Sequence, residues 1–120
     1  MSAVQKIAED YIRLWNETGA AARAGILQAA WTGDASYVDP LARVSGHEAI
    51  SALVGGVQQR FPGFRFKLRG KPDGHGDYLR FSWSLGPDGI EAPIEGSDVL
   101  VTRDGRIAQV IGFLDKLPQA

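Results

Sequence analysis

The stretch that decides the fold is "GSDVLVTRDGRIAQVIGF", residues 96–113 of the 120-residue chain. Runs rich in valine and isoleucine lie on both sides of Asp104-Gly105, and an Asp-Gly pair between two such runs is a strong signal for a two-residue β-hairpin turn. We therefore expect a strand over about residues 90–102, a tight turn at Asp104-Gly105, and a final strand over residues 106–115.

Two more strands are predicted upstream of this hairpin, because apolar and polar side chains alternate there with a period of two. The first covers residues 64–69, with an outer face formed by Arg65, Lys67 and Arg69. The second covers residues 78–85, and its inward side chains are Leu79, Phe81, Trp83 and Leu85. Pro87-Asp88-Gly89 marks the turn after it.

The amino-terminal segment has the 3.6-residue period of an amphipathic helix. Ser2 with Gln5 fits a capping box that starts this helix, and Gly19 suits its end. The apolar positions at helical spacing are Val4, Ile7, Ala8, Tyr11, Leu14 and Trp15.

A second helix is predicted over residues 21–30, and Thr32-Gly33-Asp34 is expected to break it. A short strand over residues 36–38 follows. Pro40 ends that strand because proline cannot donate a hydrogen bond to a sheet.

Ser45 with Glu48 fits a second capping box, which opens a third helix. Pro62-Gly63 ends it. Its apolar positions are Ala49, Ile50, Leu53, Val54, Val57 and Phe61.

The order of elements, helices first and then consecutive strands, predicts an α+β fold. We expect one domain over residues 1–120, in which three helices pack on a strongly curved and mostly antiparallel sheet.

Composition narrows the function classes. The net charge of −1 gives no electrostatic basis for binding nucleic acid or an anionic membrane. The chain has no cysteine, which excludes disulfides, thiolate nucleophiles and cysteine-ligated metals. No apolar run reaches the ~18 residues of a membrane span, and the amino terminus lacks the apolar segment of a signal peptide. We expect a cytoplasmic protein.

Four stretches together resemble the NTF2-like superfamily, and in particular its SnoaL-like branch. They are the helical opening, "YVDP" at residues 37–40, "SGHEAI" at residues 45–50 and the closing hairpin. The resemblance implies a cone-shaped fold in which the sheet curls around the helices and encloses an apolar pocket, and a homodimer formed through the sheet. The family includes isomerases, cyclases, dehydratases, epoxide hydrolases and binding modules, so the fold alone does not give the activity.

Within this superfamily the ketosteroid isomerases have the most similar site pattern. The resemblance places an oxyanion-hole tyrosine at Tyr11 of "YIRLWN", a general base at Asp39 of "VDP", and a protonated acid at Asp98 of "SDVLV". Val38 replaces the glutamate that precedes the base in those isomerases. The segment between Tyr11 and Asp39 is also a few residues longer than theirs.

Proton abstraction next to a carbonyl needs a base, hydrogen-bond donors at the carbonyl oxygen, and a dry pocket. Asp39 could be the base, and Tyr11 could donate. Asp98 could donate only if an apolar environment raised its pKa well above ~3.9. We expect the substrate to be held by Trp15, Phe81, Trp83 and Leu100.

Each candidate also has a purely structural interpretation. Asp39 before Pro40 is a common turn former whose side chain bonds the following backbone. Tyr11 could be a core residue with its hydroxyl satisfied. Asp98 could pair with Arg80 or Arg103.

No metal or cofactor is expected. His47 lies in the first turn of the predicted third helix and His75 in a glycine-rich turn, and neither has an acidic partner at ligand spacing. The chain carries no phosphate-binding fingerprint and no nucleophile elbow.

Three functions stay open. The first is a cofactor-independent isomerase or cyclase that moves a proton next to the carbonyl of an apolar ketone. The second is a binding domain that holds a small hydrophobic ligand without catalysis. The third is an epoxide hydrolase that uses Asp39, Arg80 and Asp98, although Arg80 falls on the strand face opposite Phe81 and Trp83.

Overall fold

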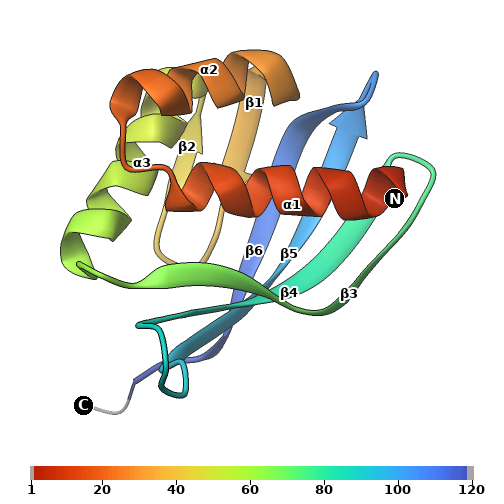
Figure 1. The fold of residues 1–120 in the computed structure, drawn as a ribbon. Helices are drawn as coiled ribbons and strands as arrows, with labels where there is room; N and C mark the ends of the chain where they lie inside the picture. Colours follow the sequence, from red (N-terminus) through yellow and green to blue (C-terminus); the bar gives the residue numbers. More distant parts are fainter. Residues whose placement is uncertain (1, 119–120) are drawn as a thin grey trace.

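Helices cover one face of a six-stranded sheet in the computed structural model, which describes residues 2–118 (Figure 1). The sheet order is β2-β1-β6-β5-β4-β3, and every pair is antiparallel except β1 with β6. The predicted α+β class is confirmed, and the sheet is open rather than closed into a barrel. The helices are α1 (Ala3–Asn16), α2 (Ala20–Ala30) and α3 (His47–Arg60), and the strands are β1 (Trp31–Val38), β2 (Arg43–Ser45), β3 (Arg65–His75), β4 (Tyr78–Gly86), β5 (Ile94–Arg103) and β6 (Arg106–Lys116).

The first helix begins as predicted. The hydroxyl of Ser2 accepts a hydrogen bond from the backbone N–H of Gln5 at 3.1 Å. The side chain of Gln5 does not complete the capping box, because it donates to Glu9 one turn later. Gly19 does not end this helix. It is the N-cap of α2, which begins at Ala20, one residue earlier than predicted.

The predicted capping box at Ser45 and Glu48 is wrong. Gly46 is the N-cap of α3 and no side chain caps it. The cause lies in β2, because Ser45 pairs there with Ser36 and the chain then turns sharply through Gly46, whose φ is +86°.

Residues 32–34 do not form a break between α2 and a later strand. The chain passes directly from Ala30 into β1, and the irregularity appears instead as a register shift against β6 between Trp31 and Ser36. At the other end of the chain, β5 begins at Ile94 rather than near residue 90.

The hairpin at Asp104-Gly105 is confirmed. Both residues have positive φ, +54° and +77°, as a type I′ turn requires. From this turn β5 and β6 pair as far as Glu95 and Lys116, with register shifts between Val101 and Thr102 and between Glu95 and Gly96.

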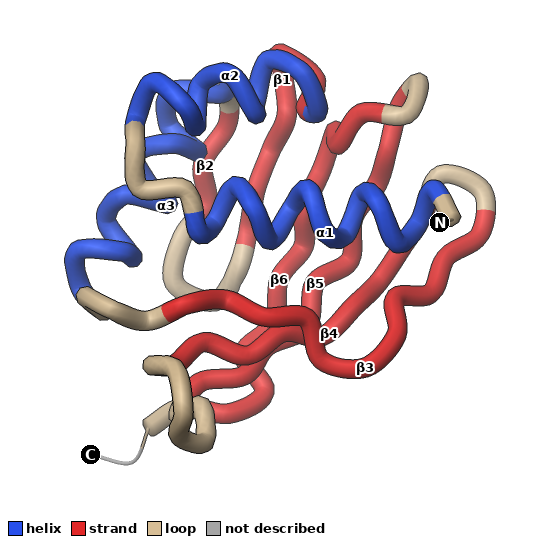
Figure 2. The backbone as a smooth tube through the Cα atoms, viewed as in Figure 1, coloured by secondary structure: helices blue, strands red, loops and turns tan. Residues whose placement is uncertain are grey.

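The first helix lies across the inner face of the sheet, in front of β4, β5 and β6 (Figure 2). Its end is fixed to β3 by Asn16, whose side chain donates to the carbonyl of Phe66 at 2.9 Å and accepts from its N–H at 2.8 Å. The inner residues Tyr11, Leu14 and Trp15 are therefore held against the sheet. Within residues 2–118, no helix is long and apolar enough to cross a membrane.

Candidate active site

The three predicted catalytic residues line one cavity of about 370 Å³, although they come from distant parts of the chain. Tyr11 lies in α1, Asp39 directly after β1, and Asp98 in β5. The cavity lies between the inner face of the sheet and the helices. The segment between Tyr11 and Asp39 is longer than in the ketosteroid isomerases, but both residues still line the same cavity as Asp98.

Tyr11 and Asp98 form a buried pair. The Tyr11 hydroxyl donates to Asp98 Oδ2 at 2.5 Å, and only 2% of Tyr11 and 3% of Asp98 are exposed. The alternative that Asp98 pairs with an arginine is wrong, because Arg80 pairs with Asp73 at 3.3 Å and Arg103 with Asp34 at 2.7 Å, both at the surface.

Burial raises the pKa of Asp98 to about 6. The hydrogen bonds from Tyr11 and from Trp83 lower this pKa, and the negative charges of Asp39 and Asp115 raise it. Burial, followed by the charge of Asp98, also raises the pKa of Tyr11 well above its ordinary value. Tyr11 is therefore always a neutral donor, while Asp98 changes from neutral to charged near pH 6.

Asp39 belongs both to a turn and to the cavity. Its Oδ1 accepts from the backbone N–H groups of Leu41 and Ala42, each at 2.8 Å, which is the turn predicted before Pro40. Its Oδ2 accepts from the hydroxyl of Tyr37 at 2.6 Å. The Asp39 side chain is thus held in a fixed orientation at the cavity wall.

Tyr37 is a site residue that sequence reasoning missed. It is buried, lines the cavity, and has its pKa raised by burial first and then by its hydrogen bond to Asp39. The signal was available, because residues two apart in a strand point to the same side. Tyr37 lies two residues before Asp39.

Gly112 of β6 lets the two acids approach each other. A Cβ at this position would lie 2.9 Å from Asp98 Oδ1 and 3.2 Å from the Cβ of Asp39. A side chain at residue 112 would therefore press on the Asp98 carboxyl group and on the Cβ of Asp39.

The predicted substrate-binding residues divide into two groups. Trp15 and Trp83 line the cavity. Phe81 and Leu100 are buried in the core, where the ring of Phe81 packs against Tyr11 at 5.2 Å between centroids. They are not among the residues that line the cavity.

Apolar side chains that sequence reasoning did not select make up much of the wall. Phe66, Leu85, Ile94 and Leu114 continue the inner surface of the sheet. Trp83 lies against Gly96, its partner across β4 and β5, and a Cβ at Gly96 would overlap its indole ring. Leu41, Arg60 and Leu117 lie at the exposed end.

Residues 8–110 match the SnoaL-like domain. A solved structure from Agrobacterium tumefaciens strain C58, called in its own description a "putative isomerase of the SnoaL-like family", is 40% identical and superposes with a TM-score of 0.91, covering 96% of this chain and 99% of that one. The chain belongs to the SnoaL-like family.

Solved structures of lower sequence identity share the fold. A "putative ketosteroid isomerase" from Kribbella flavida is 17% identical, with a TM-score of 0.71 over 98% of this chain and 82% of that one. A "putative SnoaL-like polyketide cyclase" from Jannaschia sp. CCS1 is also 17% identical, with a TM-score of 0.71 over 96% and 90%. No curated protein matches this SnoaL-like chain.

The cavity of this SnoaL-like domain offers oxygen atoms and aromatic rings to a ligand. In residues 2–118, the structure gathers no group of three or more His, Cys, Asp or Glu side chains that could hold a metal ion. The polar groups at the wall suit the binding of one ligand oxygen and the transfer of a proton.

Proposed function

We propose that this protein is an isomerase or cyclase that moves a proton next to the carbonyl of a small apolar ketone. The observation that carries the proposal is the buried Tyr11–Asp98 pair, which lines the same cavity as Asp39. In this proposal Asp39 is the base, and Tyr11 and Asp98 are the donors for an oxygen. Relatives named as isomerases and cyclases support the same reaction class.

The steps balance without a cofactor. Asp39 removes a proton from the carbon beside the carbonyl. The electron pair of that C–H bond forms a C=C bond, and the π electron pair of the carbonyl moves onto its oxygen. The resulting enolate accepts hydrogen bonds from Tyr11 and neutral Asp98. Asp39 then returns the proton to a different carbon, which completes an isomerisation.

The protonation state of Asp98 decides how many donors face the oxygen. Tyr11 has one hydroxyl hydrogen, and it points to Asp98 while that carboxyl is ionised. When Asp98 carries its own proton it becomes a donor, and the Tyr11 hydrogen is free to turn to the ligand. We therefore assign the active form to neutral Asp98.

The test is isomerisation of a β,γ-unsaturated cyclic ketone by the native protein, with Asp39→Asn in parallel. Loss of the base should reduce the rate by ~10²–10⁴-fold. Asp88→Asn, in an exposed ion pair with Lys67, is the matched control and should keep full activity. Turnover that survives in Asp39→Asn would contradict the assignment of the base.

A second candidate function is ligand binding without catalysis. The observation that favours it is that both carboxyl oxygens of Asp39 already accept hydrogen bonds from the protein, three in all, which gives this side chain a structural role in its turn. In that case a bound ketone stays unchanged over long incubation, and Asp39→Asn has little effect on its affinity.

The structure argues against the epoxide hydrolase hypothesis. It needs Arg80 in the cavity beside the two aspartates. The Arg80 side chain is instead 75% exposed and pairs with Asp73 on the other face of the sheet.

A further inference from the structure

The cavity that holds Tyr11, Asp39 and Asp98 has a cation at its exposed end, and the proposed reaction does not use it. Arg60 lines this cavity and is the last residue of α3. Its side chain is exposed, whereas only 2% of Tyr11 and 3% of Asp98 are exposed. The cavity therefore runs from a buried polar end to an open end that carries a positive charge.

Within residues 2–118, Arg60 has no carboxylate of the protein as a partner. Most of the other lysines and arginines have one: Lys6, Arg13, Lys67, Arg69, Arg80, Arg103 and Lys116. Arg23 is buried and donates to neutral oxygens instead. The cations that remain are Arg43, Arg60, Arg65, Lys71 and Arg106, and Arg60 alone among them lines the cavity of the two aspartates.

The corner that follows α3 fixes the place of this charge. The guanidinium of Arg60 packs over the ring of Phe61, 5.8 Å from its centroid, and Phe61 also lines the cavity. The ring of Phe61 stacks on Phe64 at 5.3 Å, and the Phe64 N–H donates to the Phe61 carbonyl at 3.1 Å. The guanidinium is therefore held against an aromatic ring of the cavity wall.

A comparison with α1 shows what is particular to Arg60. A cation in the last turn of a helix interacts favourably with the partial negative charge of that helix end. Arg13 has this position in α1, but it pairs with Asp10 at 3.8 Å and does not line the cavity. Arg60 has the same position in α3, lines the cavity, and lacks a carboxylate partner in the described residues.

The buried end of the cavity is unfavourable for a carboxylate on a ligand. Asp39 and Asp98 approach each other at Gly112, and besides burial the negative charge of Asp39 raises the pKa of Asp98. A third carboxylate there would add to this repulsion. Between the two ends the wall is mostly apolar. A ligand that suits both ends has its ketone oxygen inside and its negative group outside.

We propose that Arg60 binds a carboxylate of the ligand, so that the substrate is an apolar cyclic keto acid whose carboxylate lies at the open end of the cavity. The inference rests on the proposed function for the ketone, but not for the carboxylate. A planar guanidinium donates two parallel hydrogen bonds to a carboxylate. Arg60 therefore determines which end of the substrate enters first.

The test compares 2-naphthylacetate with 2-naphthylacetamide, which have the same apolar body and differ in charge. The measured quantity is the ratio of the two dissociation constants, amide over carboxylate, in the native protein, Arg60→Gln and Arg106→Gln. Arg60→Gln should lower this ratio by ~3–5-fold, as the loss of one exposed ion pair implies. Arg106→Gln is the matched control and should leave the ratio unchanged, because Arg106 is also exposed but does not line the cavity.

Two further readouts separate a specific ion pair from a packing defect. Arg60→Lys keeps the charge without the two parallel hydrogen bonds, so it should restore part of the ratio that Arg60→Gln loses. In the native protein, raising the salt concentration from ~0.01 M to ~1 M shortens the Debye length from ~30 Å to ~3 Å. The affinity for the carboxylate should then fall, and that for the amide should not.

The inference is overturned if the native protein binds the carboxylate no more tightly than the amide, or binds neither. It is also overturned if Arg60→Gln keeps the native ratio or if Arg106→Gln lowers it equally. Failure of the proposed function looks different. A native protein that turns over no ketone, yet shows the Arg60-dependent ratio, refutes proton transfer and leaves the carboxylate site intact.

Discussion

At the scale of the residue, the Tyr11–Asp98 pair places an acid where folding disfavours its charge. The carboxyl is buried, and Tyr11 and Trp83 offset only part of the cost of burial. The buried, ionised carboxyl of Asp98 therefore lowers stability at neutral pH. A group whose pKa differs between the folded and unfolded chain also makes stability depend on pH.

The sign of this dependence is opposite to that of an ordinary ion-paired aspartate. The pKa of Asp98 is about 6 in the folded protein and ~3.9 when unfolded, so between these values the folded state binds more protons. The free energy of unfolding should therefore fall as pH rises from 4 to 6, by up to about 3 kcal/mol. Asp98→Asn should flatten this part of the profile and be more stable than the native protein at pH 7. Urea unfolding at several pH values checks this, and an unchanged slope in the variant would contradict the assignment.

Tyr11→Phe should act on both partners of the pair. Removing one donor from an oxyanion site typically lowers the rate by ~10²–10³-fold. The pKa of Asp98 should rise further above 6, because the hydrogen bond from Tyr11 stabilises its ionised form. An NMR titration of the Asp98 carboxyl measures this shift. Tyr78→Phe, at an exposed tyrosine, is the control that should change neither quantity.

Sequence alone could name Tyr11, Asp39 and Asp98, because their residue types and local motifs match a known site pattern. It could not show that they converge, since Tyr11 and Asp98 are 87 residues apart and meet only through the tertiary fold. The alternation of apolar and polar residues in β4 and β5 correctly predicted that Phe81 and Leu100 point inward. Alternation does not distinguish the core from the cavity, so the structure separates these two residues from Trp83.

At the scale of the element, β6 sets the distance between the two acids. It lies between β5, which carries Asp98, and β1, which ends before Asp39. Gly112 is the point on β6 where both approach. The site therefore needs a residue without a side chain at position 112, because a Cβ there would contact both Asp98 and Asp39.

Gly112→Ala should therefore impair the site more than the fold. The added methyl would press on the Asp98 carboxyl and on Asp39, and overpacking of this kind costs ~1–3 kcal/mol of stability. We expect turnover of the ketone substrate to fall at least ~10-fold, because misplaced catalytic groups lose rate steeply. Gly33→Ala in β1 meets nothing within 4 Å and is the control. Native activity in Gly112→Ala, measured with the same assay, would show that the spacing of the acids does not matter.

The elements that could be predicted are those whose signals are local. The hairpin at Asp104-Gly105 needs only the φ angles of two residues, and the Ser2 cap needs only the first turn of α1. The start of α3 could not be predicted in this way, because pairing in β2 holds Ser45 as a strand residue. The parallel pairing of β1 with β6 joins distant segments and leaves no local pattern.

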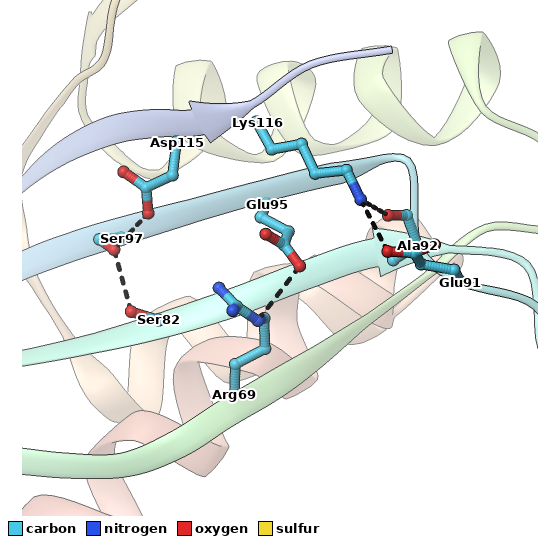
Figure 3. A network of polar contacts seen from close by, with 8 residues as sticks. All are labelled: Arg69, Ser82, Glu91, Ala92, Glu95, Ser97, Asp115 and Lys116. Carbon is cyan, nitrogen blue, oxygen red and sulfur yellow. Dashed lines mark hydrogen bonds and ion pairs between the residues drawn. The ribbon is translucent and has the colours of Figure 1, made fainter.

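At the scale of the whole molecule, the sheet presents a second face away from the helices. One end of this face carries a polar network, in which Ser82, Ser97 and Asp115 connect β4, β5 and β6 (Figure 3). Arg69 pairs with Glu95 at 3.3 Å beside it. Further along the strands the outward side chains are apolar: Val99, Val101, Ile111 and Phe113.

We expect a second copy of the chain to cover this outer face, as the family resemblance implies. Val99 and Ile111 are partners across β5 and β6, and 53% of the neighbouring Phe113 is exposed, so an apolar centre lies beside polar groups that form a rim. A stable dimer typically buries ~800 Å² per partner. Light scattering should then give twice the chain mass of 12.9 kDa for the native protein.

Phe113→Glu should give the mass of one chain, since it would put a new charge against its own copy and beside Asp115. Ile90→Glu, at a position in the loop before β5 that is also exposed, should remain a dimer. A native protein with the mass of one chain would refute the dimer while leaving the cavity on the opposite face unaffected.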